Sequence, residues 1–250
     1  MNEIISKEEL IPKIKLFDVK DPQIAEKAKP GHFVVLRVYR KGERFPLTIA
    51  GTNGDGTFRV VVNEVGKSSR KLGSMQVGDE IPDLLGPLGV SYDMEEFGTV
   101  LCVGGGVYAA PIHYVATNLK EAGNEIITVL GARNEEKLIY EDELDEVSDE
   151  LYITTDDGSK GYEGLDFIED EILSRNDIDR TVGMGRISTL KKISELTEPY
   201  NLKTMVSLTP IMVDGTGMCG SCRVLVGGET KFACIDGPKF DAHEVDWSVL

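Results

Sequence analysis

The chain has 250 residues, of which 41% are hydrophobic and 28% are charged, a balance typical of a folded, water-soluble protein. Its formal net charge of −16 argues against binding to nucleic acid or to an anionic membrane, because both reward Lys and Arg. No apolar run approaches the roughly 20 residues of a membrane span, and the acidic start lacks the pattern of an export signal. With four cysteines and no such signal, the sequence predicts a cytoplasmic protein whose cysteines serve metal or redox chemistry.

Short strands rich in β-branched residues follow one another through the first part of the chain. Turn signals such as "KPG" and "NGDG" separate the segments "KIKLFDVK", "HFVVLRVY", "PLTIAG", "TFRVVVNEV" and "DEIPDLLGP". We expect no helical stretch between residues 13 and 95. The pattern predicts a small antiparallel β-barrel as the first domain, residues 1–96.

The sequence pattern changes near residue 98, from successive short strands to strands that alternate with helices. The apolar strand "TVLCV" is followed by a glycine loop and by the helical stretch "VYAAPIHYVATNLKEAG", which Gly123 closes. The strands "EIITVLGA", "ELYITT", "RTVGM" and "KTMVSL" then alternate with the helical stretches "GLDFIEDEIL" and "ISTLKKISEL". This alternation predicts an α/β domain with a parallel sheet over residues 97–208. The regular pattern stops at Thr209, which leaves a small segment rich in glycine and cysteine, residues 209–250.

The glycine loop after "TVLCV" has the form of a dinucleotide site. Gly104, Gly106 and Ala109 fit G-x-G-x-x-A between a strand and a helix, a context that favours a nucleotide diphosphate over a plain turn. Asp156 and Asp157 follow the strand "YITT". Carboxylates suit a free ribose hydroxyl and repel a 2′-phosphate, so the sequence favours NAD(H) over NADP(H). Arg133 in "GARNEEK" is the residue able to reverse that preference.

Two motifs in the predicted barrel gather basic and hydroxyl side chains. "RFPLT" begins with Arg44 and includes Thr48, and "VGKSS" contains Lys67, Ser68 and Ser69. Each motif alone fits an ordinary hairpin edge. Together they offer a guanidinium, an ammonium and several hydroxyl groups as contacts for an anionic ligand, with Thr48 as a hydroxyl donor beside an aromatic ring.

These motifs, followed by "VGGGVYAAP", resemble the ferredoxin-reductase flavoproteins, in which a barrel binds FAD and an α/β domain binds a nicotinamide nucleotide. The resemblance implies a catalytic position for Thr48, which would hydrogen-bond near the reactive N5 edge of the flavin. The implied FAD contacts are Arg44, Pro46, Leu47, Thr48, Asn63, Gly66, Lys67, Ser68 and Ser69. The expected NAD(H) contacts are Gly104, Gly105, Gly106, Val107, Arg133, Asp156, Asp157, Gly183 and Met184.

Three of the four cysteines lie in the C-terminal segment as C-x2-C-x11-C: Cys219, Cys222 and Cys234. A disulfide is disfavoured in a reducing compartment, whereas a structural zinc with three thiolates stays open as an alternative. The surrounding glycines favour a [2Fe–2S] cluster, because their N–H groups can donate to sulfur. The fourth cysteine, Cys102, lies in an apolar strand and is expected to be a small buried hydrophobe.

The cysteine segment resembles the iron–sulfur subunits that accompany a larger flavoprotein, such as the electron-transfer subunit of dihydroorotate dehydrogenase. Those subunits have four cysteines, and here Asp214 stands in the first position. With "SLTPIMVDGTGMCGSCRV" and "DGPKFDAHEVDW", the chain is similar over essentially its whole length to the small subunits of NADH-dependent reduced ferredoxin:NADP⁺ oxidoreductases. The implied cluster ligands are Asp214, Cys219, Cys222 and Cys234; for Asp214 the alternative is a turn-forming Asp-Gly.

The resemblance implies an oxidoreductase subunit that passes electrons between NAD(H), FAD and a [2Fe–2S] cluster. Its partner would be a large subunit with its own FAD and [4Fe–4S] clusters, in an electron-bifurcating heterodimer that reaches ferredoxin indirectly. Two alternatives stay open. One is the electron-transfer subunit of another flavoenzyme, a dihydroorotate dehydrogenase or a sulfhydrogenase. The other is a non-catalytic nucleotide-binding module stapled by zinc.

Overall fold

The computed structural model describes residues 2–250, which divide into two compact units. The first unit contains the chain up to Tyr92, with Thr209–Arg223 and Lys231–Pro238. The second contains Asp93–Leu208, Val224–Thr230 and Lys239–Leu250. Residues 209–250 therefore contribute stretches to both units, and the three domain boundaries expected from the sequence stay a prediction.

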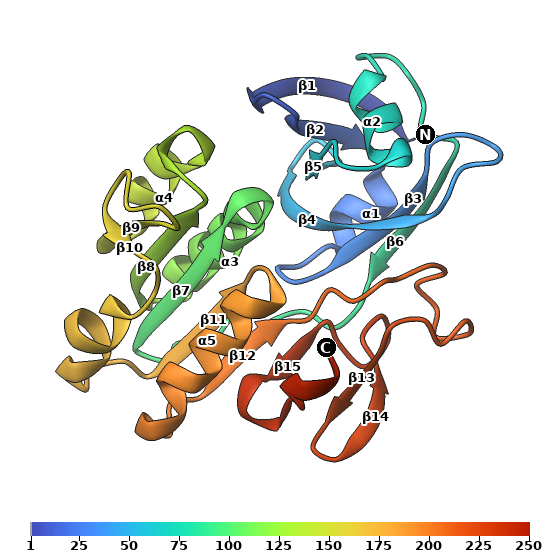
Figure 1. The fold of residues 1–250 in the computed structure, drawn as a ribbon. Helices are drawn as coiled ribbons and strands as arrows, with labels where there is room; N and C mark the ends of the chain where they lie inside the picture. Colours follow the sequence, from blue (N-terminus) through green and yellow to red (C-terminus); the bar gives the residue numbers. More distant parts are fainter. Residues whose placement is uncertain (1) are drawn as a thin grey trace. The chain divides into compact units, whose positions relative to one another are not determined.

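The first unit is built on a six-stranded antiparallel sheet with the order β1-β2-β5-β4-β3-β6 (Figure 1). Its strands are β1 (Glu3–Ile11), β2 (Ile14–Lys20), β3 (Phe33–Arg37), β4 (Phe45–Asn53), β5 (Thr57–Asn63) and β6 (Asp83–Leu88). The chain just before β6 returns to β1: Glu3 bridges Glu80, and the N–H of Ile4 donates to the carbonyl of Asp79 at 2.9 Å. This return closes the sheet into the predicted barrel.

The five strands expected in the barrel are confirmed, but three further elements were not predicted. β1 escaped notice because its sequence is mostly polar and only Ile4 is buried; backbone pairing with β2 holds it in place. The expectation of no helix between residues 13 and 95 is wrong. The barrel carries α1 (Pro22–Lys27) and α2 (Lys67–Ser74). α1 had a readable start, because Asp21 accepts hydrogen bonds from the N–H groups of Gln23 and Ile24 and Pro22 follows the cap.

The second unit is built on a seven-stranded sheet with the order β10-β9-β8-β7-β11-β12-β15, in which only β15 runs antiparallel to its neighbour among the described strands (Figure 1). Its strands are β7 (Thr99–Gly105), β8 (Glu125–Ala132), β9 (Glu150–Thr155), β10 (Tyr162–Glu163), β11 (Arg180–Met184), β12 (Thr204–Ser207) and β15 (Lys239–Asp241). Its α-helices are α3 (Ala109–Glu121), α4 (Glu141–Val147) and α5 (Ile187–Thr197). The strand order turns around at β7, which marks the usual ligand position of an open α/β sheet.

Apolar strands and one face of each helix form the core of this unit. β7 and β8 are buried through most of their length, and α3 buries Ile112, Val115 and Leu119 against the sheet. α3 ends as predicted before Gly123, whose φ of +98° suits glycine. The α-helix expected in "GLDFIEDEIL" is instead a π-helical turn, Ile168–Ile172, followed by a 3₁₀ turn, Leu173–Arg175. No helix within residues 2–250 is long and apolar enough to cross a membrane.

The expectation that regular structure stops at Thr209 is wrong in part. β13 (Arg223–Val226) and β14 (Glu229–Phe232) form a hairpin, and β15 joins the second unit's sheet. The hairpin turn consists of Gly227 and Gly228, which both have positive φ angles (+59° and +77°), as a two-residue turn requires. The short 3₁₀ turns are η1 (Gly106–Tyr108), η2 (Glu135–Lys137), η5 (Glu198–Tyr200), η6 (Ala242–Glu244) and η7 (Trp247–Val249).

A surface carboxylate links α3 to the start of β8 and gives the second unit a pH-dependent contribution to stability. Asp149 accepts a hydrogen bond from Lys120 Nζ at 2.6 Å and another from the N–H of Ile126 at 2.8 Å. Lys120 first, and then this N–H group, hold the pKa of Asp149 below its ordinary value of 3.8. A carboxyl with a lowered pKa stabilises the fold above its ordinary pKa, and this contribution is lost as the pH falls through the folded-state value.

We therefore predict that Asp149→Asn lowers the free energy of unfolding at pH 7 by about 0.5–1 kcal/mol, the range for exposed ion pairs. The difference from the wild type should shrink as the pH is lowered below 3.8. Denaturant titrations across this range measure it, with Asp145→Asn on the exposed face of α4 as the control of equal charge change. A difference that stays constant with pH would contradict the assignment.

Candidate cofactor and nucleotide sites

The glycine loop at the carboxyl end of β7 is tightly packed on one side and open on the other. Gly105 pairs with Gly131 of β8, and a Cβ on Gly105 would lie 2.1 Å from the Gly131 carbonyl oxygen. Only glycine permits this approach. Gly106 has a φ of +54°, and no atom lies within 4 Å of the position that its Cβ would take. The loop runs into η1 and α3, so its geometry fits the close approach of a diphosphate to backbone N–H groups.

The predicted nucleotide contacts gather at one edge of the second unit's sheet. Gly104 and Gly105 end β7, and Gly106 and Val107 follow it in η1. Arg133 follows β8, Asp156 and Asp157 follow β9, and Gly183 and Met184 end β11. Neighbouring loops at this edge are tied together, because Asp156 N–H donates to the carbonyl of Ala132 at 2.9 Å and Glu135 N–H donates to Ser159 Oγ at 2.8 Å. The buried side-chain oxygen of Asn134 in the same loop has no hydrogen-bond partner within the described chain. The edge therefore offers glycine backbone, carboxylates and an unused acceptor.

The two carboxylates predicted to contact ribose differ in their surroundings. Asp157 caps its own turn, and its hydrogen bond with Ser159 lowers its pKa. Asp156 forms an ion pair with Arg186, with 3.0 Å between Oδ2 and Nη2. Arg186 follows β11 and was not among the predicted site residues. Its position directly after "VGMG" was the only sequence signal for it.

The predicted flavin contacts lie in the first unit around β4. Thr48, Leu47 and Pro46 are half-buried on this strand, where they pair with Phe33, Val34 and Val35 of β3. Arg44, just before β4, is exposed, and its Nη2 lies 2.8 Å from Asp83 Oδ2.

Arg37 lies 2.9 Å from the same Asp83 oxygen, so one carboxylate neutralises only part of two guanidinium charges. The residual positive charge fits an anionic ligand such as a diphosphate. Asp83 and Arg37 were missed, because their pairing with Arg44 depends on strand neighbours that are distant in sequence.

The "VGKSS" motif forms the start of α2, where the helix dipole favours an anion. Ser69 Oγ accepts from the N–H of Gly66 at 2.9 Å, so this hydroxyl already serves the helix start. Lys67 Nζ lies 5.8 Å from the centre of the Tyr39 ring. Ser68 is buried, and its hydroxyl lies 3.5 Å from the Glu43 carboxylate. The last predicted contact, Asn63, is exposed at the end of β5.

The cysteine loop, residues 214–222, belongs to the first unit. Three glycines give it its path, since Gly215, Gly217 and Gly220 have φ angles of +75°, +80° and +64°. Asp214 organises the turn: Oδ1 accepts from Thr216 N–H and Oδ2 accepts from Cys219 N–H, both at 2.7 Å. The Thr216 N–H first, and then Cys219, hold the pKa of Asp214 below its ordinary value, so the side chain is an anion at neutral pH.

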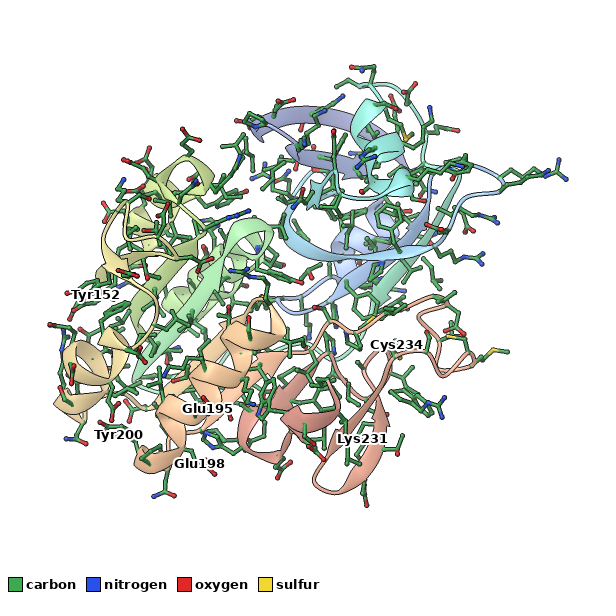
Figure 2. All side chains as sticks on the ribbon, in the orientation of Figure 1. Tyr152, Glu195, Glu198, Tyr200, Lys231 and Cys234 are labelled. Carbon is green, nitrogen blue, oxygen red and sulfur yellow. The ribbon has the colours of Figure 1, made fainter. Side chains whose placement is uncertain are left out.

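Two of the three cysteines in this segment are buried side by side. Cys222 is 1% exposed, and Cys234, which Figure 2 labels, is 2% exposed. Ala233 N–H donates to the Cys222 carbonyl at 3.0 Å. Burial first, and then the neighbouring Cys222 thiol, raise the pKa of Cys234 to about 11. Cys219 is exposed instead, and its sulfur lies 3.1 Å from Ser221 Oγ. Cys102 is buried in β7, as its apolar surroundings predicted.

Three of the four predicted cluster ligands, Asp214, Cys219 and Cys222, lie in the cysteine loop, and Cys234 follows β14. Together they do not have the geometry of a complete metal site. Within residues 2–250, no group of three or more His, Cys, Asp or Glu side chains has the arrangement of a metal site. The donor set still fits an iron–sulfur cluster, because three sulfurs and one anionic oxygen meet glycine N–H groups. Gly217 N–H already hydrogen-bonds to Cys234. Ligation would require Cys219 to turn inward from Ser221.

The cysteine loop packs closely on the barrel. A Cβ on Gly215 would lie 2.6 Å from Leu88 of β6 and 2.9 Å from Val35 of β3. Val35 pairs with Pro46 of β4, so β3 alone separates the loop from the strand that carries Thr48. The predicted cluster site and the predicted flavin site therefore belong to one packed body.

Exposed apolar side chains surround the cysteine loop. We call Ile211, Val213, Met218 and Ile235 the apolar rim; they are 78%, 45%, 89% and 49% exposed, respectively. All four belong to the first unit. Large apolar side chains in such numbers around a loop are typical of a surface that contacts another protein.

Comparison with known proteins confirms the resemblance found in the sequence. A family model described as "Iron-sulfur cluster binding domain of dihydroorotate dehydrogenase B" matches residues 209–246. The dihydroorotate dehydrogenase B electron transfer subunit homolog of Thermotoga maritima is 45% identical, over 100% of this chain and 89% of the relative. The dihydroorotate dehydrogenase B (NAD(+)) electron transfer subunit of Enterococcus faecalis is 30% identical, over 98% and 97%.

Among solved structures, that of an NADH-dependent reduced ferredoxin-NADP oxidoreductase, described for flavin-based electron bifurcation, matches this chain with a TM-score of 0.94. It is 45% identical, and the match covers 100% of this chain and 91% of that chain. This agreement confirms the expected fold class: an antiparallel barrel, a parallel-sheet α/β part and a small C-terminal cysteine segment. The chain belongs to the family of dihydroorotate dehydrogenase B electron-transfer subunits and their homologues.

Proposed function

We propose that this chain is an electron-transfer subunit that passes electrons between NAD(H), FAD and a [2Fe–2S] cluster, and from there to a larger partner subunit. The observation that carries the proposal is the packing of Gly215 against β3, which brings the cysteine loop within one strand of Thr48. Family membership supports it, since the relatives are themselves named electron transfer subunits. A thiolate-bound cluster needs reduced cysteines, so the proposal places the subunit in the cytoplasm.

The more specific form of the proposal is a subunit of an electron-bifurcating NADH-dependent ferredoxin:NADP⁺ oxidoreductase. The 45% identity and the TM-score of 0.94 to a protein of that name support it. Its partner would be a large flavoprotein with [4Fe–4S] clusters that forms a heterodimer with this chain and exchanges electrons with ferredoxin. Asp214, in place of the first cysteine, distinguishes this chain from the four-cysteine pattern.

In the first unit, the barrel would hold FAD, which when bound supplies the change from paired to single electron transfer. Arg44 and Arg37, which share Asp83, would bind its diphosphate, and the start of α2 with Lys67 would add positive potential. The hydroxyl group of Thr48 would donate a hydrogen bond to the edge of the flavin ring. Pro46 and Leu47 on the same strand would exclude water from one side of the ring.

In the second unit, the carboxyl edge of the sheet would bind NAD(H). Gly104–Gly106 would present backbone N–H groups to the diphosphate. Asp156 and Asp157 would accept hydrogen bonds from ribose hydroxyls, which favours a nucleotide without a 2′-phosphate. Arg133 is exposed at the same edge. Gly183 and Met184, which are buried at the end of β11, would border the nicotinamide side.

In the cysteine loop, Asp214, Cys219, Cys222 and Cys234 would hold the cluster. Asp214 is kept anionic and near Cys219 by two backbone N–H groups, which fits a hard oxygen ligand for ferric iron. The same hydrogen bonds also fit a carboxylate that only closes a turn. These two roles make different demands on the side chain, so substitution separates them.

The second candidate is the electron-transfer subunit of a dihydroorotate dehydrogenase. The 30% identity over nearly the full length of the Enterococcus faecalis subunit favours it. Reduction of NAD⁺ that depends on dihydroorotate, by the purified complex, decides between the two. The zinc-stapled alternative is decided by metal analysis of the same sample.

We predict that substitutions of Asp214 separate ligation from turn formation. Wild type should contain about two irons and two sulfides per flavin. Asp214→Cys should keep both, with an altered electron paramagnetic resonance spectrum of the reduced cluster. Asp214→Asn keeps an oxygen that can accept from Thr216 N–H but loses both the acceptor for Cys219 N–H and the anionic ligand, so its iron content should fall severalfold. NADH should still bleach the flavin in this variant, while electron delivery to the partner is lost.

Asp246→Asn is the matched control, because Asp246 also accepts from the N–H group two residues ahead and lies outside the cysteine loop. Its iron content should equal that of the wild type. A normal iron content and an unchanged spectrum in Asp214→Asn would assign Asp214 to the turn alone. A wild-type complex with full flavin and cluster that NADH fails to reduce would overturn the proposed function.

We also propose that the apolar rim docks the large subunit. Met218→Asp should weaken the complex with the co-expressed large subunit at least about tenfold, because a charge in a buried interface centre is costly. Val77→Asp is the control, since Val77 is an exposed apolar residue of the same unit, 59% exposed and outside the rim. Both variants should keep their cluster and their reduction by NADH. Equal affinities of the two variants for the partner would exclude the rim as the docking surface.

A further inference from the structure

An ion pair spans the carboxyl edge of the second unit's sheet. Asp156 follows β9 and Arg186 follows β11, and the strand order β9-β8-β7-β11 places two strands between them (Figure 1). Neighbouring strands lie about 4.8 Å apart, so β9 and β11 are separated by roughly 14 Å. Asp156 Oδ2 and Arg186 Nη2 nevertheless meet at 3.0 Å. Their side chains therefore reach toward each other over the ends of β8 and β7, where the loop Gly104–Gly106 begins.

The pair is weakly held. The side chains of Arg186 and Asp156 are 69% and 53% exposed, so solvent screens their attraction. Two other charged side chains of these loops interact with different groups. Lys160 forms an ion pair with Glu141 at 2.7 Å, and Asp157 accepts a hydrogen bond from Ser159 N–H. A ligand that offers each partner a better group can separate the two.

A dinucleotide carries both complementary groups. Its diphosphate matches the planar fork of a guanidinium, and its adenosine ribose offers two hydroxyl groups to a carboxylate. The diphosphate position implied by Gly104–Gly106 lies at the end of β7, next to β11 and hence to Arg186. The ribose position implied by Asp156 lies at the end of β9. The two ends of the ion pair therefore correspond to two successive parts of the same ligand.

We propose that Arg186 is a nucleotide-binding residue that exchanges partners: it binds Asp156 in the free chain and the dinucleotide diphosphate in the complex. The released Asp156 carboxylate then accepts from the ribose hydroxyls. This inference rests on the proposed binding of NAD(H) and extends it to selectivity. With Asp156 present, a 2′-phosphate meets a carboxylate and is repelled. With Asp156 neutralised, this repulsion is gone, and Arg186, whose counterion among residues 2–250 is Asp156, adds positive potential that attracts the extra phosphate.

The test measures binding of ADP-ribose and of 2′-phospho-ADP-ribose by calorimetry on the full-length chain purified with its cofactors. The wild type should prefer ADP-ribose. Arg186→Gln should weaken both ligands roughly tenfold, the loss expected for a hydrogen-bonded charge. Asp156→Asn should weaken ADP-ribose severalfold and remove or reverse the preference. The double variant should gain less for 2′-phospho-ADP-ribose than Asp156→Asn does, because the part of the gain that Arg186 supplies is lost.

Asp145→Asn on the exposed face of α4 is the matched control, since it makes the same charge change outside the proposed nucleotide contacts and should leave the preference for ADP-ribose in place. Thermal unfolding of each variant verifies folding, and Arg186→Lys offers a second variant if the glutamine variant is unstable; it should weaken ADP-ribose less. An unchanged affinity of Arg186→Gln for ADP-ribose, or an unchanged preference in Asp156→Asn, would overturn the inference.

The two ligands contain no nicotinamide, so their binding does not depend on electron transfer. A chain that shows the expected pattern but is not reduced by NADH would refute the proposed function and leave this inference standing. A chain that is reduced by NADH, but in which Arg186→Gln does not change the affinity for either ligand, would support the proposed function and refute this inference.

Discussion

The close approach of the cysteine loop to the barrel is the constraint on which the proposed electron path depends. Gly215 meets this constraint in two ways: its φ of +75° suits glycine, and a Cβ would collide with Leu88 and Val35. A larger residue would have to push the loop outward from β3. Because β3 alone lies between this loop and the strand of Thr48, such a displacement would lengthen the step between flavin and cluster directly.

Several charged groups of the candidate sites are paired with other groups of the chain. Arg44 shares Asp83 with Arg37, Arg186 faces Asp156, and the Asp214 carboxylate holds two backbone N–H groups. Such pairing keeps side chains near their working positions without leaving bare charges in the fold. For the exposed Arg186–Asp156 pair, where we propose that the ligand replaces an existing partner, affinity would reflect a difference between two sets of interactions.

Sequence patterns were informative where the signal is local. Alternating β-branched residues located five barrel strands, and the order of strands and helices identified the parallel sheet. β1 was missed because a strand that buries only Ile4 looks polar, and α2 was missed because "VGKSS" reads equally well as a hairpin edge. Spacing identified the three cysteines of the tail, but the outward turn of Cys219 depends on its neighbour Ser221.

The pairs Arg44–Asp83 and Arg186–Asp156 were beyond the reach of the sequence. Their members lie 39 and 30 residues apart, and only the strand order brings them together. For the same reason the sequence suggested Asp156 as a ribose contact but gave no indication of its pairing with Arg186. Local motifs therefore indicated the glycine backbone as a candidate phosphate contact, which stays a prediction, whereas the pairing of the charged side chains around it follows from the strand order.

The path of the C-terminal segment also bears on how this protein can be rearranged. After Leu208 the chain enters the first unit, leaves it at Arg223, returns at Lys231 and leaves again at Pro238 to add β15 beside β12. A cysteine segment with this path is not an independent module that can be moved between proteins. Grafting it onto another reductase, or trimming it from this one, would strip the barrel of the loop on β3 and the sheet of its last strand together. In the sequence this segment looks like a separate module, but in the structure its stretches belong to both units.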